Sequence, residues 1–321
     1  MRTAIVTNKI GSVGGVQTFS NDLANLLEER GHHVDLIGRE SLGNYEGNNL
    51  EEAVGNFFNK ANKLFPYDVV LCNGEFGYSV EHPKAINVFH GNYYGYAMSV
   101  RDLVPESVTR GRLEKAKLQK VSAKEKYVVS VSESSRNQLE AYGIPVDKVI
   151  NNSVDTNLFF PIESPVEDHS ISLARGMYYE KGFDILHRLG KMGIKIRVYS
   201  DLKIESLNLD ERDFIDRGLL REEFGRSRLL ISPSRFEGGN LTVLEAMASG
   251  CPIVTTPTGY GMDIGREISN FVAESYDEFF VKVSLVGDNR EKYSRQAIEY
   301  FHAHHSPEKF RDEWISLIEG I

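Results

Sequence analysis

The chain has 321 residues, long enough for two domains of ordinary size. Hydrophobic residues make up 41% and charged residues 26%, as in globular proteins, and the formal net charge of −9 argues against nucleic acid as the main partner. Every apolar run is much shorter than the roughly 20 residues of a membrane helix, and the chain opens on a strand pattern where a signal peptide would have an apolar core.

The first half of the chain alternates short apolar runs with amphipathic segments. Strands are expected over residues 2–7, 34–37, 67–72, 85–89 and 127–132, and helices over 16–30 and 133–142. This alternation is typical of a Rossmann-like domain. The glycines after the first strand (Gly11, Gly14 and Gly15) do not form G-x-G-x-x-G, so a dinucleotide site is only weakly indicated.

Polar residues follow two of these predicted strands. Asn73-Gly74-Glu75 comes after the third strand and His90-Gly91-Asn92 after the fourth. Ligands of doubly wound sheets bind at the carboxyl ends of the strands, so we expect His90 to belong to a functional site. The tyrosine-rich segment 93–96 fits the wall of a binding site and the packing of a loop equally well.

Residues 110–126 are predicted to form a helix with seven basic and two acidic side chains. Docking on anionic lipid is one interpretation, but apolar residues are sparse and a solvated face is favoured. The two cysteines, Cys72 and Cys251, lie in apolar strand contexts that indicate reduced thiols. We therefore expect a cytoplasmic protein, with peripheral binding at the inner membrane face as the open alternative.

The second half repeats the α/β alternation after a proline-containing, acidic segment at 161–169, which is predicted to link two domains. Strands are expected over residues 171–174, 195–199, 228–231 and 252–255, with a short helix over 222–227. The predicted domains are therefore 1–162 and 163–305, followed by an amphipathic helix within 306–321.

The segment 232–250 carries the most informative pattern. A turn containing Glu237, Gly238 and Gly239 leads into a helix that has Asn240 at its N-cap and ends at Gly250. The start of a helix presents unpartnered backbone N–H groups and a positive dipole end, which suits a phosphate or diphosphate.

Two carboxylates flank this predicted anion site. Glu237 lies in the turn, and Glu245 lies within the helix, on the order of 6 Å along its axis. Carboxylates accept hydrogen bonds from vicinal hydroxyl groups, so the pattern predicts a ligand with hydroxyls on both sides of a diphosphate, such as a nucleotide sugar. A plain βαβ crossover with two surface acids is the alternative.

The run E-G-G-N-L-T-V-L-E-A-M-A-S-G at 237–250 resembles the E-x7-E signature of retaining glycosyltransferases of the GT-B fold, family 4 (glycosyl transferases group 1). Other segments match that family in order: Gly14-Gly15, His90-Gly91, 149–161 and 175–182. Ser153 departs from the pattern, which usually has glycine there. The resemblance implies two Rossmann-like, doubly wound domains facing across a cleft, with the C-terminal helix 306–321 crossing back to the first.

The resemblance also implies roles for the matched residues. Glu245 would bind the ribose hydroxyls, while Glu237 and His90 would contact the transferred sugar. Arg175 and Lys181 would clamp the diphosphate, where negative charge develops as the anomeric bond breaks. The implied donor-binding residues are Gly14, Gly15, Gly238, Gly239, Asn240, Leu241, Thr242 and Glu245.

The expected reaction is transfer of a hexosyl-type unit from a nucleotide diphosphate sugar to an acceptor hydroxyl with retention of anomeric configuration. The acceptor would be a glycan, a lipid-linked molecule or a small molecule, in polysaccharide, glycolipid or glycoconjugate biosynthesis. No D-x-D motif occurs and the histidines near 302–305 lack a matching ligand set, so no metal or other cofactor is expected. A nucleotide-sugar 2-epimerase and a non-catalytic donor-binding subunit remain as alternatives.

Overall fold

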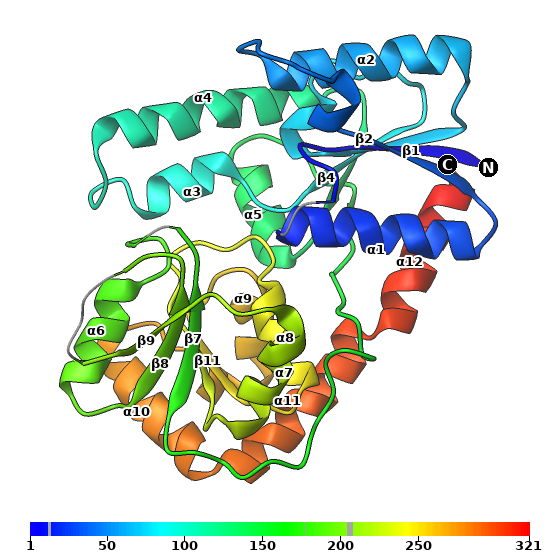
Figure 1. Cartoon of the computed structure of the whole chain (residues 1–321). Helices are drawn as coiled ribbons and strands as arrows, with labels where there is room; N and C mark the ends of the chain where they lie inside the picture. Colours follow the sequence, from blue (N-terminus) through cyan, green and yellow to red (C-terminus); the bar gives the residue numbers. More distant parts are fainter. Residues whose placement is uncertain (12–13, 177, 204–207) are drawn as a thin grey trace. The chain divides into compact units, whose positions relative to one another are not determined.

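The computed structural model describes residues 1–11, 14–176, 178–203 and 208–321, which form two compact units (Figure 1). Unit 1 comprises Met1–Ala97, Glu106–Asn152 and Phe310–Ile321. Unit 2 comprises Met98–Pro105 and Ser153–Lys309.

The sheet of unit 1 is parallel, with strand order β2-β1-β3-β4-β5-β6. Its strands are β1 (Arg2–Val6), β2 (His33–Ile37), β3 (Val69–Asn73), β4 (Ala85–Phe89), β5 (Tyr127–Ser130) and β6 (Lys148–Val149). Its helices are α1 (Gly15–Glu29), α2 (Leu50–Leu64), α3 (Tyr93–Ser99), α4 (Glu106–Ser122) and α5 (Glu133–Ala141). The chain reverses its direction across the sheet between β1 and β3, so the ends of these strands form the topological switch point.

The sheet of unit 1 buries apolar side chains on both faces, because alternate residues of each strand point to opposite sides. Ile5 of β1 belongs to a cluster with α1, whereas Ala4 and Val6 belong to a cluster with α2. The last helix, α12 (Pro307–Gly320), lies beside α1 (Figure 1). It contributes Trp314 to the α1 cluster, with its ring centroid 5.5 Å from that of Phe19. The predicted return of the C-terminal helix to the first domain is confirmed.

Unit 2 contains a second parallel sheet, with strand order β11-β10-β7-β8-β9. Its strands are β7 (Ser170–Ala174), β8 (Ile196–Ser200), β9 (Asp210–Asp213), β10 (Leu230–Ser232) and β11 (Ile253–Thr255). Its helices are α6 (Phe183–Lys191), α7 (Arg217–Arg226), α8 (Leu241–Ala248), α9 (Tyr260–Glu267), α10 (Tyr276–Asp288) and α11 (Arg290–His305). The switch point of this sheet lies between β7 and β10, so the loops after these two strands are neighbours.

The predicted fold class is therefore confirmed: the chain builds two Rossmann-like domains on parallel sheets. Within the described ranges, no helix combines the length and the apolar character needed to cross a membrane.

Candidate active site

The loop between β10 and α8 is closed by the N-cap of the helix. Asn240 Oδ1 accepts a hydrogen bond from the N–H of Thr242 at 3.1 Å, and Asn240 Nδ2 donates to Ser232 Oγ at 2.9 Å. Ser232 ends β10, so Asn240 ties the start of the helix to the end of the strand. The turn with Gly238 and Gly239 is thus fixed in front of the first N–H groups of α8, which begins at Leu241.

The backbone of Glu237 is anchored in this turn by the loop after β11. The N–H of Glu237 donates to Thr258 Oγ1 at 2.9 Å, and the same hydroxyl lies 3.3 Å from the carbonyl oxygen of Glu237. Gly259 has φ +55°, and a Cβ atom there would lie 3.0 Å from Glu237 Cβ. Glycine at this position therefore lets the two loops approach closely.

The structure brings Lys181 and Glu237 together. Lys181 Nζ lies 2.6 Å from Glu237 Oε1, and the two side chains are 24% and 15% exposed. Partial burial strengthens an ion pair relative to one at the surface, because solvent screens it less. A cation from the β7 loop and an acid from the β10 loop thus meet at the switch point.

Arg235 joins these two loops and was not identified from the sequence. Its guanidinium donates two parallel hydrogen bonds to the carboxylate of Asp184, each 2.7 Å long. It also donates to the carbonyl oxygen of Tyr179 at 2.6 Å, and the backbone N–H of Arg235 donates to that of Glu180 at 2.8 Å. This fork fixes the loop that carries Lys181 against the loop that carries Glu237.

Glu245 lies on α8 and is 6% exposed. Its Oε1 accepts hydrogen bonds from Arg217 Nε at 3.1 Å and Nη2 at 2.7 Å. Arg217 begins α7, five residues before the helix predicted over 222–227, and was also missed.

Arg175, the second predicted clamp cation, has different neighbours. Its side chain is 52% exposed, its Nε lies 3.6 Å from Asp201 Oδ2, and its guanidinium carbon lies 5.0 Å from the centre of the Phe214 ring. Among the contacts of the described residues, Lys181 makes the ion pair with Glu237, whereas Arg175 pairs with Asp201.

In unit 1, His90 follows β4 and contacts Asn73 at the end of β3, one of the two strands of the switch point. Its Nε2 is 3.0 Å from Asn73 Oδ1, and Asn73 Nδ2 donates to Ser20 Oγ at 2.8 Å. The Phe19 ring packs edge-on at 4.5 Å, and burial lowers the pKa of His90 to about 4. The ring is therefore neutral near pH 7, with the Nε2 proton donated to Asn73.

Gly14 and Gly15 lie at the start of α1, the helix that carries Ser20 and Phe19. Gly14 precedes the helix in an extended conformation, and its carbonyl oxygen accepts a hydrogen bond from the N–H of Thr18 at 2.9 Å. The two glycines and His90 thus flank the same end of the unit 1 sheet.

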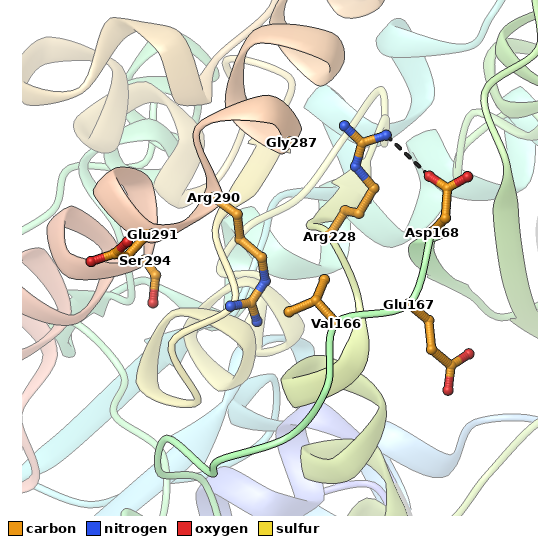
Figure 2. A pocket seen from close by; sticks show the side chains of 8 residues that line it. All are labelled: Val166, Glu167, Asp168, Arg228, Gly287, Arg290, Glu291 and Ser294. Carbon is orange, nitrogen blue, oxygen red and sulfur yellow. Dashed lines mark hydrogen bonds and ion pairs between the residues drawn. The ribbon is translucent and has the colours of Figure 1, made fainter.

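A cavity of about 470 Å³ in unit 2 lies at the opposite, amino ends of the strands (Figure 2). Asp168 precedes β7 and Arg228 precedes β10, and the two side chains hydrogen-bond at 3.4 Å. Arg290 donates to the carbonyl oxygens of Ser227 at 2.8 Å and Gly225 at 3.0 Å, which closes the end of α7. These charges connect strand and helix ends, so the cavity is not part of the candidate site.

Two doubly wound domains, one with an acid-flanked helix start at its switch point, define a protein of the GT-B glycosyltransferase class. Residues 13–158 match the family model described as Glycosyltransferase Family 4, and residues 211–289 match the one described as Glycosyl transferases group 1. The chain belongs to this family of glycosyltransferases. The matched ranges include His90, Glu237 and Glu245, whereas Arg175 and Lys181 lie outside them.

Solved structures with the same fold include sucrose-phosphate synthase from Thermosynechococcus elongatus, with TM-score 0.80 and 13% identity over 100% of this chain and 98% of that one. WaaG, a glycosyltransferase involved in lipopolysaccharide biosynthesis, gives TM-score 0.74 and 15% identity over 99% and 100%. An α-glucosyltransferase in complex with UDP and a 13-mer DNA containing an HMU base gives TM-score 0.62 and 14% identity over 99% of each chain. A search of curated proteins finds no match in sequence.

Proposed function

We propose that the protein transfers a sugar from a nucleotide diphosphate sugar to a hydroxyl group of an acceptor, with retention of anomeric configuration. The observation that carries this proposal is the Lys181–Glu237 ion pair beside the start of α8, the helix that also bears Glu245. The family match supports sugar transfer, and a structural neighbour in complex with UDP supports the class of donor.

In this proposal the backbone N–H groups of the turn and of the first residues of α8 bind the diphosphate, with Thr242 beside them. Glu245 accepts hydrogen bonds from the ribose, and Glu237 accepts them from the transferred sugar. Before the donor binds, the ammonium of Lys181 is held by Glu237. When the donor binds, the same ammonium lies close enough to the turn to neutralise the diphosphate.

The bond that breaks joins the anomeric carbon to a diphosphate oxygen, and the electron pair goes to that oxygen. Lys181 stabilises the charge, while the acceptor oxygen attacks the same face of an oxocarbenium-like sugar. The leaving oxygen takes the acceptor proton. His90, which is neutral near pH 7, is proposed to contact the transferred sugar, and the backbone at Gly14 and Gly15 to bind the donor.

We propose that this chemistry needs no metal ion, because protein cations supply the positive charge. Arg175 is the second such cation. Exposed ion pairs contribute about 0–1 kcal/mol, so the guanidinium can exchange Asp201 for a bound diphosphate at little cost.

The proposed acceptor is a hydroxyl of a glycan, a lipid-linked molecule or a small molecule. One structural neighbour was solved in complex with DNA. This chain has a net charge of −9 and so lacks the excess of basic side chains that nucleic acid binding requires, which argues against a nucleic acid acceptor. Buried, unpaired Cys72 and Cys251 favour the cytoplasm, where thiols stay reduced.

The proposal is tested by incubating the purified protein with UDP-, GDP- and ADP-sugars and measuring release of the nucleoside diphosphate. We expect slow hydrolysis of one donor, faster release with an acceptor, and a product of unchanged anomeric configuration by NMR. Conversion of the donor to an epimer would establish the epimerase alternative. Tight donor binding without turnover would establish a binding subunit.

A further inference from the structure

Glu245 is held by a residue of a second helix, Arg217. Asp216, the N-cap of α7, accepts a hydrogen bond from the N–H of Gly218 at 2.8 Å and so fixes the first turn of that helix. From this turn, Arg217 donates to Glu245 through Nε at 3.1 Å and Nη2 at 2.7 Å, and both bonds end on Oε1.

An aromatic ring also fixes the guanidinium of Arg217. Its central carbon lies 5.2 Å from the centre of the Phe159 ring, and Phe159 is fully buried. The side chain of Arg217 is 34% exposed and that of Glu245 is 7% exposed. Arg217 therefore lies between the solvent and the buried carboxylate of Glu245. The Phe159 ring and the first turn of α7 fix its orientation.

A carboxylate that binds two neighbouring hydroxyl groups must be ionised and must not rotate. Burial alone opposes ionisation, and a guanidinium beside the carboxylate offsets this cost. The two hydrogen bonds from Arg217 both end on Oε1 and hold that oxygen in place.

We propose that Arg217 is a positioning residue that keeps Glu245 ionised and oriented for the ribose hydroxyls of the donor. This inference rests on the function proposed for Glu245 and deepens it. Arg217 then sets the preference for a ribonucleotide over a nucleotide without the 2′- and 3′-hydroxyl groups. If the ion pair served only to join α7 to α8, its loss would lower stability and leave that preference intact.

The test compares two probes on the full chain: whichever of UDP, GDP and ADP binds the wild type most tightly, and its 2′,3′-dideoxy analogue. Dissociation constants are measured for the wild type, Arg217→Met, Arg217→Lys and Glu245→Gln. The matched control is Arg221→Met, because Arg221 lies one turn further along α7 and stacks on Phe160 at 4.5 Å.

We expect the wild type and Arg221→Met to prefer the ribonucleotide to the same extent. Arg217→Met should bind the ribonucleotide about tenfold more weakly or worse, because the ribose hydroxyls then donate to a Glu245 carboxylate that is no longer held in place. Its binding of the dideoxy analogue should be unchanged. Its preference should fall to that of Glu245→Gln. Arg217→Lys keeps the positive charge but loses the pair of hydrogen bonds, so its preference for the ribonucleotide should be intermediate. If Arg217→Met does not fold, Arg217→Lys takes its place in the test.

The inference about Arg217 would be overturned if Arg217→Met and Arg217→Lys kept the full wild-type preference while Glu245→Gln lost it. The proposed donor site would then still stand. Tighter ribonucleotide binding by Arg217→Met would also overturn it, because Arg217 would then obstruct the site. A wild type that binds none of the nucleotides, or binds both probes equally, would remove the proposed donor site and this inference with it.

Discussion

At the scale of single residues, the candidate site depends on cations that are already paired inside the protein. Lys181 and Arg217 each contact one of the two carboxylates, Glu237 and Glu245. A lysine ammonium is a compact charge that exchanges partners readily, whereas an arginine fork holds a carboxylate in one plane. The two ion pairs therefore suit different tasks: Lys181 is placed to move to a diphosphate, and Arg217 is placed to remain.

Replacement of Lys181 by alanine should lower turnover about a hundredfold or more, because its ammonium would no longer neutralise the charge on the leaving oxygen. The matched control is Lys195→Ala. Lys195 also pairs with a carboxylate of unit 2 at 2.6 Å, that of Asp168, but at the amino ends of the strands. Steady-state turnover with saturating donor is the measurement, and a Lys181→Ala enzyme as fast as Lys195→Ala would refute the assignment.

The low pKa of His90 predicts an effect of pH on stability. Burial lowers the pKa from its ordinary 6.5 to about 4, so the unfolded state binds this proton more readily than the folded state. Stability should therefore fall as the pH drops from about 6.5 towards 4, and His90 should account for about 1–2 kcal/mol of the loss between pH 7 and 5.

Urea unfolding at both pH values checks this effect in the wild type and in His90→Gln, whose side-chain amide can still donate to Asn73. The variant should lose less stability on acidification than the wild type. His302→Asn, at an exposed position of α11, should behave like the wild type. An equal loss in His90→Gln and the wild type would contradict the neutral state of His90.

At the scale of elements, the site depends on how closely the loop after β7 approaches the loop after β10. Gly182 has φ +69°, and a Cβ atom at this position would lie 2.2 Å from the carbonyl oxygen of Pro233. The backbone beside Lys181 thus touches the backbone that leads to Glu237, and only glycine permits this contact.

Gly182→Ala should therefore separate the two loops as well as strain the backbone. The matched control is Gly193→Ala, since Gly193 has φ +92° and open space around it. The control should cost about 1–2 kcal/mol, the penalty of a left-handed backbone with a side chain. Gly182→Ala should cost about 1–3 kcal/mol more from the collision and should also lose turnover, measured by thermal unfolding and donor hydrolysis. Equal stability and activity in the two variants would show that the close approach is unimportant.

The sequence analysis predicted the helices and strands that are determined by the pattern of their own residues. The mostly apolar run Ala85–Phe89 forms β4 over its whole length, and the pattern around Asn240 forms a capped helix. The strand β9 was missed because its residues, Asp210–Asp213, are all charged, and hydrogen bonds to β8 make it a strand despite its composition. The early start of α7 was missed because Gly218 interrupts the helical pattern.

For the candidate site, the sequence analysis predicted the residues of the local motif but missed their partners from distant parts of the chain. Glu237 and Glu245 lie in one short motif, and their positions follow from a turn and a helix. The partners Arg217 and Asp184 come from elements 28 and 51 residues away from the residues they contact. Such contacts depend on the tertiary fold, so spacing along the chain does not reveal them.

At the scale of the whole molecule, the two units have separate apolar cores, and the end of the chain belongs to the core of the first. Phe310 and Trp314 of α12 pack with Phe19 of α1 and with strands whose residues come from the first half of the chain. The last twelve residues, Phe310–Ile321, are therefore needed to complete a domain that begins at Met1.

Trp314 is the residue at which this dependence is best tested, because its side chain is fully buried among α1 and the unit 1 sheet. Trp314→Ala should destabilise unit 1 by about 3–5 kcal/mol, through lost burial and the cavity that remains. Trp314→Phe should cost much less, since the indole Nε1 has no hydrogen-bond partner to lose among the residues that the structure describes. Hydrogen exchange followed by mass spectrometry assigns the effect to a unit: protection should fall in peptides from β1 and β3 and stay unchanged in peptides from β7 and β10. Val281→Ala, at a 61% exposed position of α10, should change neither set. A Trp314→Ala protein with native protection in β1 and β3 would mean that the first domain folds without its C-terminal helix.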